Sequence, residues 1–379
     1  MKPVKIGLIG SGIISYTYLD NLVRRFDSVE VVGCSDLIDE RSAKRAEEFG
    51  IRKMSNDEIF GSDEIEMVLD TTYWSSHTLI NRQGLEAGKH IYTEKSLGNG
   101  YLEAAETVKL AKEKGLYLGC APDTFLGAGY QTCRKLIEEG FIGEPVSATS
   151  FLARDIWPEG KEGEPRFLAG GTMPYDMSIY YTNALVHLFG PIRRVGGFAP
   201  HYAYRHKHPD HPRYGKAMEV ETPTSMYGAL EFHSGVYAVF SLLGQSFMET
   251  PRIEVYGTHG TLICPDPNTF GGPIYLKRRG YQEFMEIPLL FDNVTTNKGY
   301  STGPWSESRR GLGVADMARA IREGRRHRCN ADLHLHAMEL IYGLEQCSTK
   351  QVIYEMTTKP EQPAPLKPNC MGRVHEAAF

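Results

Sequence analysis

A glycine-rich turn near the amino terminus constrains the fold more than any other stretch of the sequence. Residues 4–10 form a short apolar run, and the segment Gly10-Ser11-Gly12-Ile13-Ile14-Ser15 continues it with the pattern G-x-G-x-x-small. The first glycine allows a tight turn, the second lets backbone approach a pyrophosphate, and the small last residue lets helix and strand pack closely. N–H groups at the start of the next helix bind phosphate. The turn therefore predicts a dinucleotide-binding βαβ unit.

The end of the second expected strand, at 29–36, indicates which dinucleotide is bound. This strand ends in Asp36, and a carboxylate at this place accepts hydrogen bonds from both ribose hydroxyls and repels a 2′-phosphate. Leu37 and Ile38 follow, so no arginine stands directly after the acid. We therefore expect NAD rather than NADP; the alternative is a turn without a ligand, in which Asp36 only caps a loop. The cofactor residues predicted from this region are Gly10, Gly12, Ile13, Ile14 and Asp36.

The alternation of strands and helices changes character near residue 123. Before it, short apolar runs alternate with amphipathic helices, which predicts an α/β Rossmann domain with a parallel sheet over 1–122. After it come long strands with hairpin-type breaks, which predict an α+β substrate and oligomerisation domain with a large, mainly antiparallel sheet over 123–379. Two late helices, 313–324 and 332–346, are expected to pack against one domain or the other.

The charge and the cysteines limit the partners and the compartment. The net charge of −5 argues against nucleic acid and against an anionic membrane surface, because both bind basic proteins. No apolar stretch approaches the roughly 20 residues of a membrane span. The strand pattern starts by Val4, which leaves no room for a signal peptide. Seven cysteines without a CxxC pair indicate reduced, buried thiols and hence a cytoplasmic protein.

A histidine-rich stretch at 201–215 raises the question of a metal site. It contains His201, His206, His208 and His211 together with Asp210. The spacing matches no standard site, and the prolines and arginines among them favour a solvated loop. We therefore expect no metal here and consider a contact between subunits the better interpretation.

Several further motifs occur in a fixed order along the chain. They are TTYWSSH (71–77), TEKSLG (93–98), GCAPDTFLG (119–127), IGEP (142–145), GGTMPYDMSIYY (170–181), PRIEVYGTHGTL (251–262) and GVADMARAI (313–321). With the glycine turn, they resemble the Gfo/Idh/MocA family, named for glucose–fructose oxidoreductase, inositol dehydrogenase and a rhizopine-catabolism protein. The resemblance covers nearly the whole chain and is more specific for the fold than for the substrate. It implies a Rossmann domain, an open-faced β-sheet domain, and NAD(P)-dependent chemistry on hydroxyl or carbonyl groups of sugars and cyclitols.

The chain departs from the family pattern at two places. The usual Glu-Lys-Pro triplet is Glu94-Lys95-Ser96, which keeps the lysine that, in the family, touches the nicotinamide ribose and the reacting oxygen. The usual Asp-x-x-x-His of the second domain is Asp176 followed by Tyr180, so a tyrosine stands where the family carries its acid/base histidine. The resemblance thus implies Lys95, Asp176 and Tyr180 as the catalytic residues.

The tyrosine at position 180 leaves three interpretations open. A tyrosine has a reference pKa of about 10 and needs a neighbouring cation to ionise, which Lys95 would supply in a Tyr–Lys pair. Alternatively, Lys95 acts alone with its pKa lowered by burial, or Tyr180 is a packing residue and the chemistry is lost. His187 lies about 10 Å of helix rise beyond Tyr180, so we expect it to be structural rather than a displaced base.

The remaining cofactor and substrate residues are expected in the same motifs, in the segment 154–160 after a strand, and at the junction of the domains. Thr72, His77 and Glu94 join Lys95 at the cofactor, with His77 lining the nicotinamide pocket or, alternatively, only starting a helix. Trp157 is expected to stack on a sugar ring and Arg154 to bind hydroxyls; packing at the rim is the alternative. The predicted substrate residues are Lys95, Asp123, Arg154, Trp157, Asp176 and Tyr180.

These observations predict an NAD-dependent oxidoreductase that acts on a sugar, glycoside or cyclitol. Two alternatives remain, namely a redox-neutral enzyme that retains NAD for elimination or epimerisation, and an NAD-binding protein without catalysis. In the second domain, the strands 225–232 and 236–240 carry apolar residues on both faces. Because one face of the sheet is expected to lack helices, we predict a homodimer or homotetramer formed through it.

Overall fold

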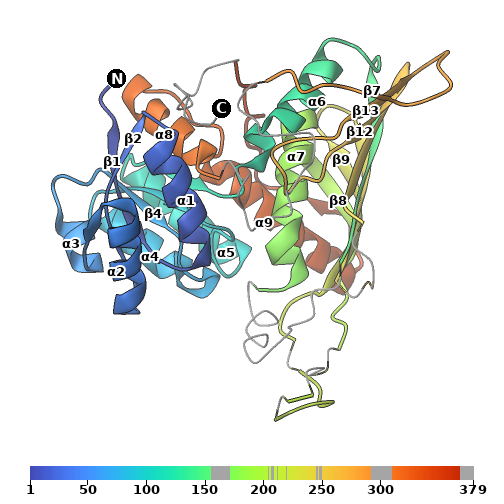
Figure 1. The fold of residues 1–379 in the computed structure, drawn as a ribbon. Helices are drawn as coiled ribbons and strands as arrows, with labels where there is room; N and C mark the ends of the chain where they lie inside the picture. The colour runs from blue at the N-terminus through green and yellow to red at the C-terminus, as the bar shows by residue number, and fades with distance from the viewer. Residues whose placement is uncertain are drawn as a thin grey trace.

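The computed structural model of the chain contains two β-sheets, with helices between them and around the first (Figure 1). The structure describes residues 1–154, 171–203, 205, 209–210, 212–218, 220–244, 246, 250–291 and 310–367.

The first sheet has six strands, all parallel, in the order β3-β2-β1-β4-β5-β6. This is the Rossmann strand order, and it confirms the predicted fold of the amino-terminal part. The strands are β1 Val4–Ile9, β2 Val29–Ser35, β3 Arg52–Lys53, β4 Met67–Asp70, β5 His90–Thr93 and β6 Leu118–Cys120. The helices are α1 Ile13–Arg24, α2 Asp39–Phe49, α3 Asn56–Gly61, α4 Trp74–Glu86 and α5 Tyr101–Glu113.

The strand order places the cofactor crevice. The order reverses between β1 and β4, and in open α/β sheets ligands bind at such a point, outside the carboxyl ends of the strands. The residues at this edge are fixed because the strands that carry them are buried on both faces, as the successive residues Leu8 and Ile9 of β1 illustrate.

The second sheet has nine strands in the order β14-β13-β12-β11-β7-β10-β9-β8-β15. All neighbouring pairs are antiparallel except β7 and β10, which are parallel, so the prediction of a mainly antiparallel sheet is confirmed. The strands are β7 Pro145–Ala153, β8 Ile192–Phe198, β9 Ser225–Phe232, β10 Tyr237–Leu243, β11 Arg252–Gly257, β12 Gly260–Cys264, β13 Tyr275–Arg278, β14 Met285–Glu286 and β15 Tyr354–Glu355. The helices and turns that follow the Rossmann strands are η1 Thr124–Leu126, α6 Ala128–Glu138, η3 Pro174–Ser178, α7 Ile179–Phe189, α8 Leu312–Glu323 and α9 Ala331–Lys350.

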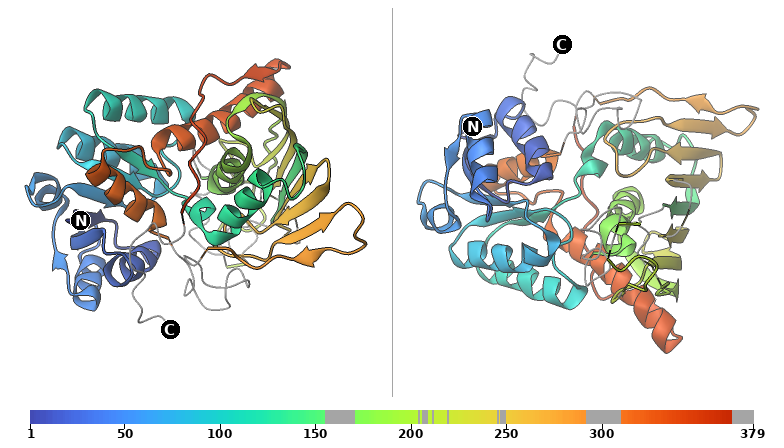
Figure 2. Two further views of the ribbon diagram at one scale, coloured as in Figure 1. Left: turned by 90° about the horizontal axis from the view of Figure 1, so that it is seen from above. Right: turned by 60° about the horizontal axis from the view of Figure 1, so that its bottom comes forward.

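The two faces of the second sheet differ. Helices α6, α7 and α9 cover the face turned toward the Rossmann domain (Figures 1 and 2). Along β10, Ala238 and Phe240 point to this face and are buried, whereas Tyr237 and Val239 alternate with them and are each 57% exposed. No helix of the described ranges covers the face that carries Tyr237 and Val239.

Helix α8 lies with the Rossmann domain, although it comes from the last quarter of the chain (Figure 1). Arg322 near its end pairs with Glu66 at 2.6 Å and donates to the carbonyl of Pro3 at 2.9 Å. The chain thus returns to the first domain after completing most of the second sheet.

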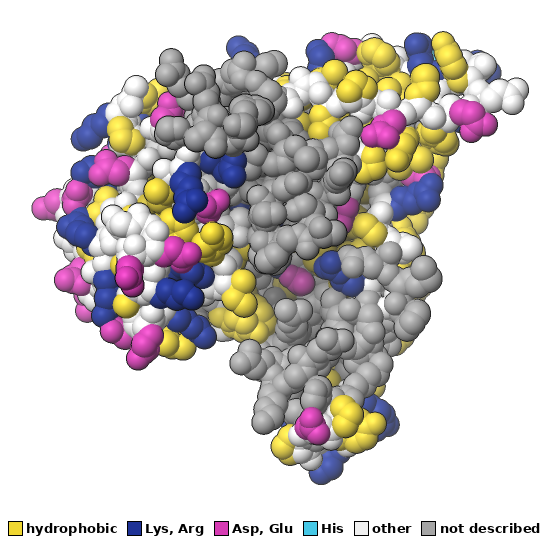
Figure 3. Space-filling model, viewed as in Figure 1, with side chains coloured by type: hydrophobic (Ala, Val, Ile, Leu, Met, Phe, Trp, Pro, Cys, Tyr) yellow, Lys and Arg dark blue, Asp and Glu magenta, His cyan; other side chains and the backbone are white. Residues whose placement is uncertain are grey.

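The described residues were searched for charged patches, membrane-spanning helices and clusters of metal ligands. Acidic and basic side chains are interspersed on the Rossmann side of the face in Figure 3. No described helix combines the length and the apolar composition that a membrane crossing requires. Within the same residues, no three His, Cys, Asp or Glu side chains are grouped to hold a metal ion. His206, His208 and His211 of the histidine-rich stretch lie outside them.

Candidate active site

The glycine turn forms an anion site at the start of α1. Gly10 has φ +97°, and a Cβ added there would lie 2.6 Å from backbone atoms of Thr71 and Thr72, so only glycine fits. A Cβ on Gly12 would meet nothing within 4 Å. Gly12 is also the N-cap of α1, and no side chain caps the helix, so its first N–H groups face open space. These features fit the pyrophosphate of a dinucleotide.

Asp36 stands beside this turn, directly after β2. Its Oδ2 accepts a hydrogen bond from the N–H of Ser11 at 2.7 Å, and its Oδ1 accepts one from the N–H of Ile38 at 2.8 Å. Carboxylate oxygens accept more than one hydrogen bond each, so the half-buried group can still receive ribose hydroxyls. The contacts fit the predicted ribose ligand and also hold the turn against β2.

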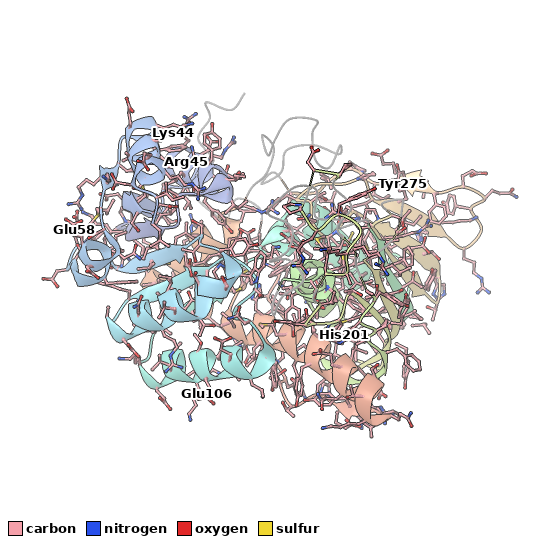
Figure 4. All side chains as sticks on the ribbon, turned by 90° about the horizontal axis from the view of Figure 1, so that it is seen from below. Lys44, Arg45, Glu58, Glu106, His201 and Tyr275 are labelled. Carbon is pink, nitrogen blue, oxygen red and sulfur yellow. The ribbon has the colours of Figure 1, made fainter. Side chains whose placement is uncertain are left out.

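Arg45 is a cation beside the turn that the sequence analysis did not identify. It projects from α2 on the Rossmann side of the molecule, opposite Tyr275 of β13 (Figure 4). Its guanidinium donates to Ser15 Oγ at 3.3 Å and to the Gly12 carbonyl at 3.4 Å, and it pairs with Glu48 at 2.8 Å. The contact could not be predicted from the sequence, because Arg45 follows Asp36 by nine residues and is brought to the turn only by the packing of α2.

One cavity of about 480 Å³ joins the turn to the second domain. It is lined from the Rossmann domain by Ile13, Ile14, Thr72, Trp74, Glu94 and Lys95. The second part of the chain contributes Arg154, Tyr175, Asp176, Tyr180, Asn268 and Arg310. The cavity thus includes the predicted catalytic residues and part of the cofactor turn, as a shared site for cofactor and substrate requires.

Lys95, Asp176 and Tyr180 lie together in this cavity. Lys95 follows β5, and its Nζ forms an ion pair with Asp176 of η3. The same Nζ lies 5.7 Å from the centre of the Tyr180 ring at the start of α7. Burial lowers the pKa of Lys95, but Asp176, Tyr180 and Glu94 outweigh it and raise the pKa above its ordinary value. The raised pKa argues against one alternative from the sequence, a lysine base with a lowered pKa.

Arg310 and Asn268 also lie beside Tyr180, and neither was predicted from the sequence. Arg310 Nη2 donates to Tyr180 Oη at 3.1 Å and to Asn268 Oδ1 at 3.0 Å. Arg310 is only 4% exposed. The sequence near Tyr180 does not predict these contacts, because Arg310 is 130 positions away.

Glu94 and Thr72 take up the positions predicted for them at the cavity wall. Glu94 Oε1 accepts from Tyr18 Oη of α1 at 2.7 Å, and its Oε2 accepts from the Lys95 N–H at 3.1 Å. Thr72 donates from Oγ1 to Asp70 Oδ1 at 2.6 Å. These bonds fix the carboxyl ends of β4 and β5, where the nicotinamide end of a dinucleotide would lie.

Two residues predicted for the site, His77 and Asp123, do not face the cavity. His77 is fully buried, and its ring nitrogens contact the carbonyls of Ser96 at 2.7 Å and Thr72 at 3.1 Å; it joins two loops instead of lining the pocket. Asp123 is also fully buried, and its Oδ2 accepts from the N–H groups of Gly311 and Gly313, each at 2.9 Å. Its role is therefore to cap α8 and not to bind substrate. Trp157 lies outside the described residues.

The structure also places Arg154 and His187. Arg154 lines the cavity and contacts the sulfur of Met177 at 3.4 Å. His187 is fully buried beside Gln131 at 3.2 Å, and burial holds its pKa well below the ordinary value. A neutral, enclosed imidazole agrees with the expected structural role.

Two aromatic residues of the TTYWSSH motif, for which the sequence predicted no role, also lie at the cavity. Tyr73 and Trp74, between β4 and α4, have ring centres 3.6 Å apart, and Tyr73 is 48% exposed. Both line the cavity. Such an aromatic pair offers a flat apolar surface for a nicotinamide or a sugar ring.

Comparison with known proteins agrees with this geometry. Residues 4–121 match the oxidoreductase family with an NAD-binding Rossmann fold, and residues 130–263 match the GFO/IDH/MocA C-terminal domain. The chain is 31% identical over 263 residues to 1,5-anhydro-D-fructose reductase of Ensifer adhaerens, covering 68% of this chain and 74% of the relative. It is 30% identical to inositol 2-dehydrogenase 3 of Saccharopolyspora erythraea, covering 41% of this chain and 47% of that protein.

Solved structures show the same fold. Levoglucosan dehydrogenase in complex with NADH and L-sorbose superposes with a TM-score of 0.79 at 18% identity, covering 94% of this chain and all of that chain. The glycine turn, the acid after β2 and the open N-terminus of α1 fit the dinucleotide that such Rossmann domains bind. The chain therefore belongs to the Gfo/Idh/MocA family of NAD-binding oxidoreductases.

Proposed function

We propose that the protein is a dehydrogenase that transfers hydride between NAD and a hydroxyl or carbonyl group of a sugar, glycoside or cyclitol. The observation that carries this proposal is the meeting of Lys95, Asp176 and Tyr180 in a cavity that also reaches the glycine turn. The names of the relatives support the substrate class, because they include a sugar reductase, an inositol dehydrogenase and a xylose dehydrogenase.

NAD, when bound, accepts or supplies the hydride. Gly10 and Gly12 with the N-terminus of α1 would hold its pyrophosphate, Asp36 its adenosine ribose, and Thr72 and Glu94 would lie toward its nicotinamide. The position of Lys95 at the carboxyl end of β5 supports a contact with both the nicotinamide ribose and the substrate.

Each catalytic side chain has a separate task in the proposal. Lys95, kept cationic by Asp176, donates a hydrogen bond to the reacting oxygen and stabilises its negative charge. Tyr180 handles the proton: as the phenolate it accepts the hydroxyl proton during oxidation, and as the phenol it returns a proton to the oxygen during reduction. Asp176 orients Lys95 and accepts a hydrogen bond from a second substrate hydroxyl.

Two finer points belong to the same proposal. The exposed apolar side chains of Tyr237 and Val239, on the outer face of the second sheet, support a homodimer or homotetramer formed through that face. All six cysteines in the described part of the chain are free and buried, which supports a reducing compartment such as the cytoplasm.

The test follows the NADH absorbance band of purified protein with NAD and a panel of sugars and cyclitols. Net NADH formation supports the proposal. A bound-cofactor spectrum without net NADH, accompanied by a changed sugar, favours the redox-neutral alternative, and NAD binding with neither favours a non-catalytic protein. With an active substrate, Lys95→Ala should lower the rate by about 10² to 10⁴, the range of acid/base assistance, and leave NAD affinity less affected. Tyr180→Phe is the matched variant, since it removes one oxygen and keeps the ring; full activity with an unchanged pH profile would assign Tyr180 to packing.

A further inference from the structure

Arg310 is a buried cation that contacts the oxygen of Tyr180. Its Nη2 lies 3.1 Å from Tyr180 Oη, whereas Lys95 lies 5.7 Å from the ring centre and is engaged by Asp176. A second bond from Arg310, to Asn268 at 3.0 Å, fixes the direction of the guanidinium. Arg310 is therefore a second cation beside Tyr180, which donates directly to the phenol oxygen, while Lys95 also interacts with Tyr180 electrostatically.

The backbone of Arg310 is held by the Rossmann domain. Its carbonyl accepts a hydrogen bond from Asn21 Nδ2 of α1 at 2.8 Å, and this asparagine is buried. The next N–H groups, of Gly311 and Gly313, bind the buried carboxylate of Asp123 at 2.9 Å each. Arg310 thus has its backbone fixed to the cofactor domain and its guanidinium on the first turn of α7 in the other domain.

The chemistry of the two groups sets the direction of the hydrogen bond. A guanidinium only donates, so the oxygen of Tyr180 must be the acceptor and its own hydrogen is directed elsewhere. A hydrogen bond from a cation to an oxygen is stronger when that oxygen becomes negative, as it does when the phenol gives up its proton. Histidine needs no such partner, because it exchanges protons near neutral pH without help.

We propose that Arg310 is the positioning residue that makes Tyr180 competent for proton transfer, by stabilising its phenolate and by directing its proton into the cavity. The inference rests on the proposed function and explains how a tyrosine can stand at the position of the family's histidine. Among the described residues, the other charged groups near Tyr180 include Lys95 and Asp176, with Glu94 acting on Lys95 and Asp123 on Arg310.

The first test needs no turnover. Tyrosine ionisation is followed by ultraviolet difference absorbance in the full-length protein, and subtraction of the Tyr180→Phe titration isolates Tyr180. Arg310→Met should move the ionisation of Tyr180 upward by about one pH unit or more, a tenfold change in the ionisation constant. Arg322→Met is the matched control, because Arg322 lies on α8 but pairs with Glu66, and its titration should equal that of wild type. An unchanged titration in Arg310→Met overturns the inference.

Arg310→Lys keeps the charge and also serves if the methionine variant does not fold. In this variant, Tyr180 should ionise at nearly the same pH as in the wild type. An upward shift as large as that expected for Arg310→Met would contradict an electrostatic role. In turnover assays, Arg310→Met should lower the rate by about 10²-fold and displace the pH profile, with little further loss in a Tyr180→Phe background. Fully multiplicative losses would show that Arg310 does not act through Tyr180. Absence of any turnover by wild type would refute the dehydrogenase, and the titration would still decide the role of Arg310.

Discussion

The two glycines of the phosphate turn allow a test in which stability and cofactor affinity separate. At Gly12, φ is −74° and an added Cβ meets no atom within 4 Å, so alanine fits the ligand-free chain. Such a replacement contributes about 0.4–1 kcal/mol because the unfolded chain loses freedom, but alanine is a poorer N-cap than glycine by a similar amount, so the net change in stability should be small. The same methyl group occupies the open space in which we place the pyrophosphate. Gly12→Ala should therefore weaken NAD binding at least about tenfold, or about 1.4 kcal/mol.

Gly10→Ala is the matched variant with the opposite expectation. Its positive φ of +97° disfavours any side chain, which costs about 1–2 kcal/mol. The new Cβ also lies 2.6 Å from backbone atoms of Thr71 and Thr72, which cannot rotate away, and overpacking of this kind costs a further 1–3 kcal/mol or so. Gly10→Ala should thus lose roughly 2–5 kcal/mol of unfolding free energy without any ligand.

Urea denaturation of the ligand-free proteins and calorimetric titration with NAD measure the two effects independently. Gly12→Ala should unfold at a urea concentration close to that of wild type and bind NAD weakly. Wild-type NAD affinity in Gly12→Ala would refute the placement of the pyrophosphate over this glycine. Wild-type stability in Gly10→Ala would refute the argument from close backbone approach.

Three further outcomes are expected. Asp36→Ala should weaken NAD binding and reduce the difference in affinity between NAD and NADP, because a carboxylate repels a 2′-phosphate and Arg45 lies beside the same turn. Equal affinities of the wild type for both cofactors, measured by titration, would contradict this prediction. Val239→Lys, on the exposed face of β10, should give monomers by light scattering where wild type gives dimers or tetramers, and a wild-type monomer at micromolar concentration would refute the proposed interface. Burial raises the pKa of Asp123 from 3.8 to about 6, so the folded state binds this proton more tightly than the unfolded chain. Asp123 should therefore make stability fall by roughly 3 kcal/mol as the pH rises from about 4 to 6. In Asp123→Asn, urea unfolding over this pH range should show no such decrease in unfolding free energy. If the unfolding free energies of wild type and variant changed with pH in parallel, the proposed effect of Asp123 would be excluded.

The fold could be predicted where local pattern and geometry carry the same information. The glycine turn, the acid after β2 and the alternation up to residue 122 were sufficient for the Rossmann order. The mixed pairing of the second sheet was not predictable in this way, because alternation along β7 reports which face is buried and not which strand lies beside it. The β7–β10 pair joins Ser147 to Tyr237, and no local signal spans that distance.

The candidate site was predictable only in its centre. Lys95, Asp176 and Tyr180 came from motif positions and do lie together. His77 occupies a position next to the site in the sequence, but its ring turns inward to two carbonyls, and sequence position does not determine that direction. Arg310 illustrates the opposite case, since its place is set by contacts with Asn21 and Asp123, which are far from it in the sequence.

The central position of β7 has a consequence for synthesis of the chain. Its two neighbours, β10 and β11, both come later, and about 80 residues separate Ala153 from Tyr237. At roughly 5–20 residues per second, a ribosome needs about 4–16 s to supply β10. During that interval β7 has no partner strand, so its edges are open to other chains, while the first five helices and six strands can already fold. Arg310 is made later still, so the proposed proton-transfer site is completed only when the nascent chain returns to the Rossmann domain.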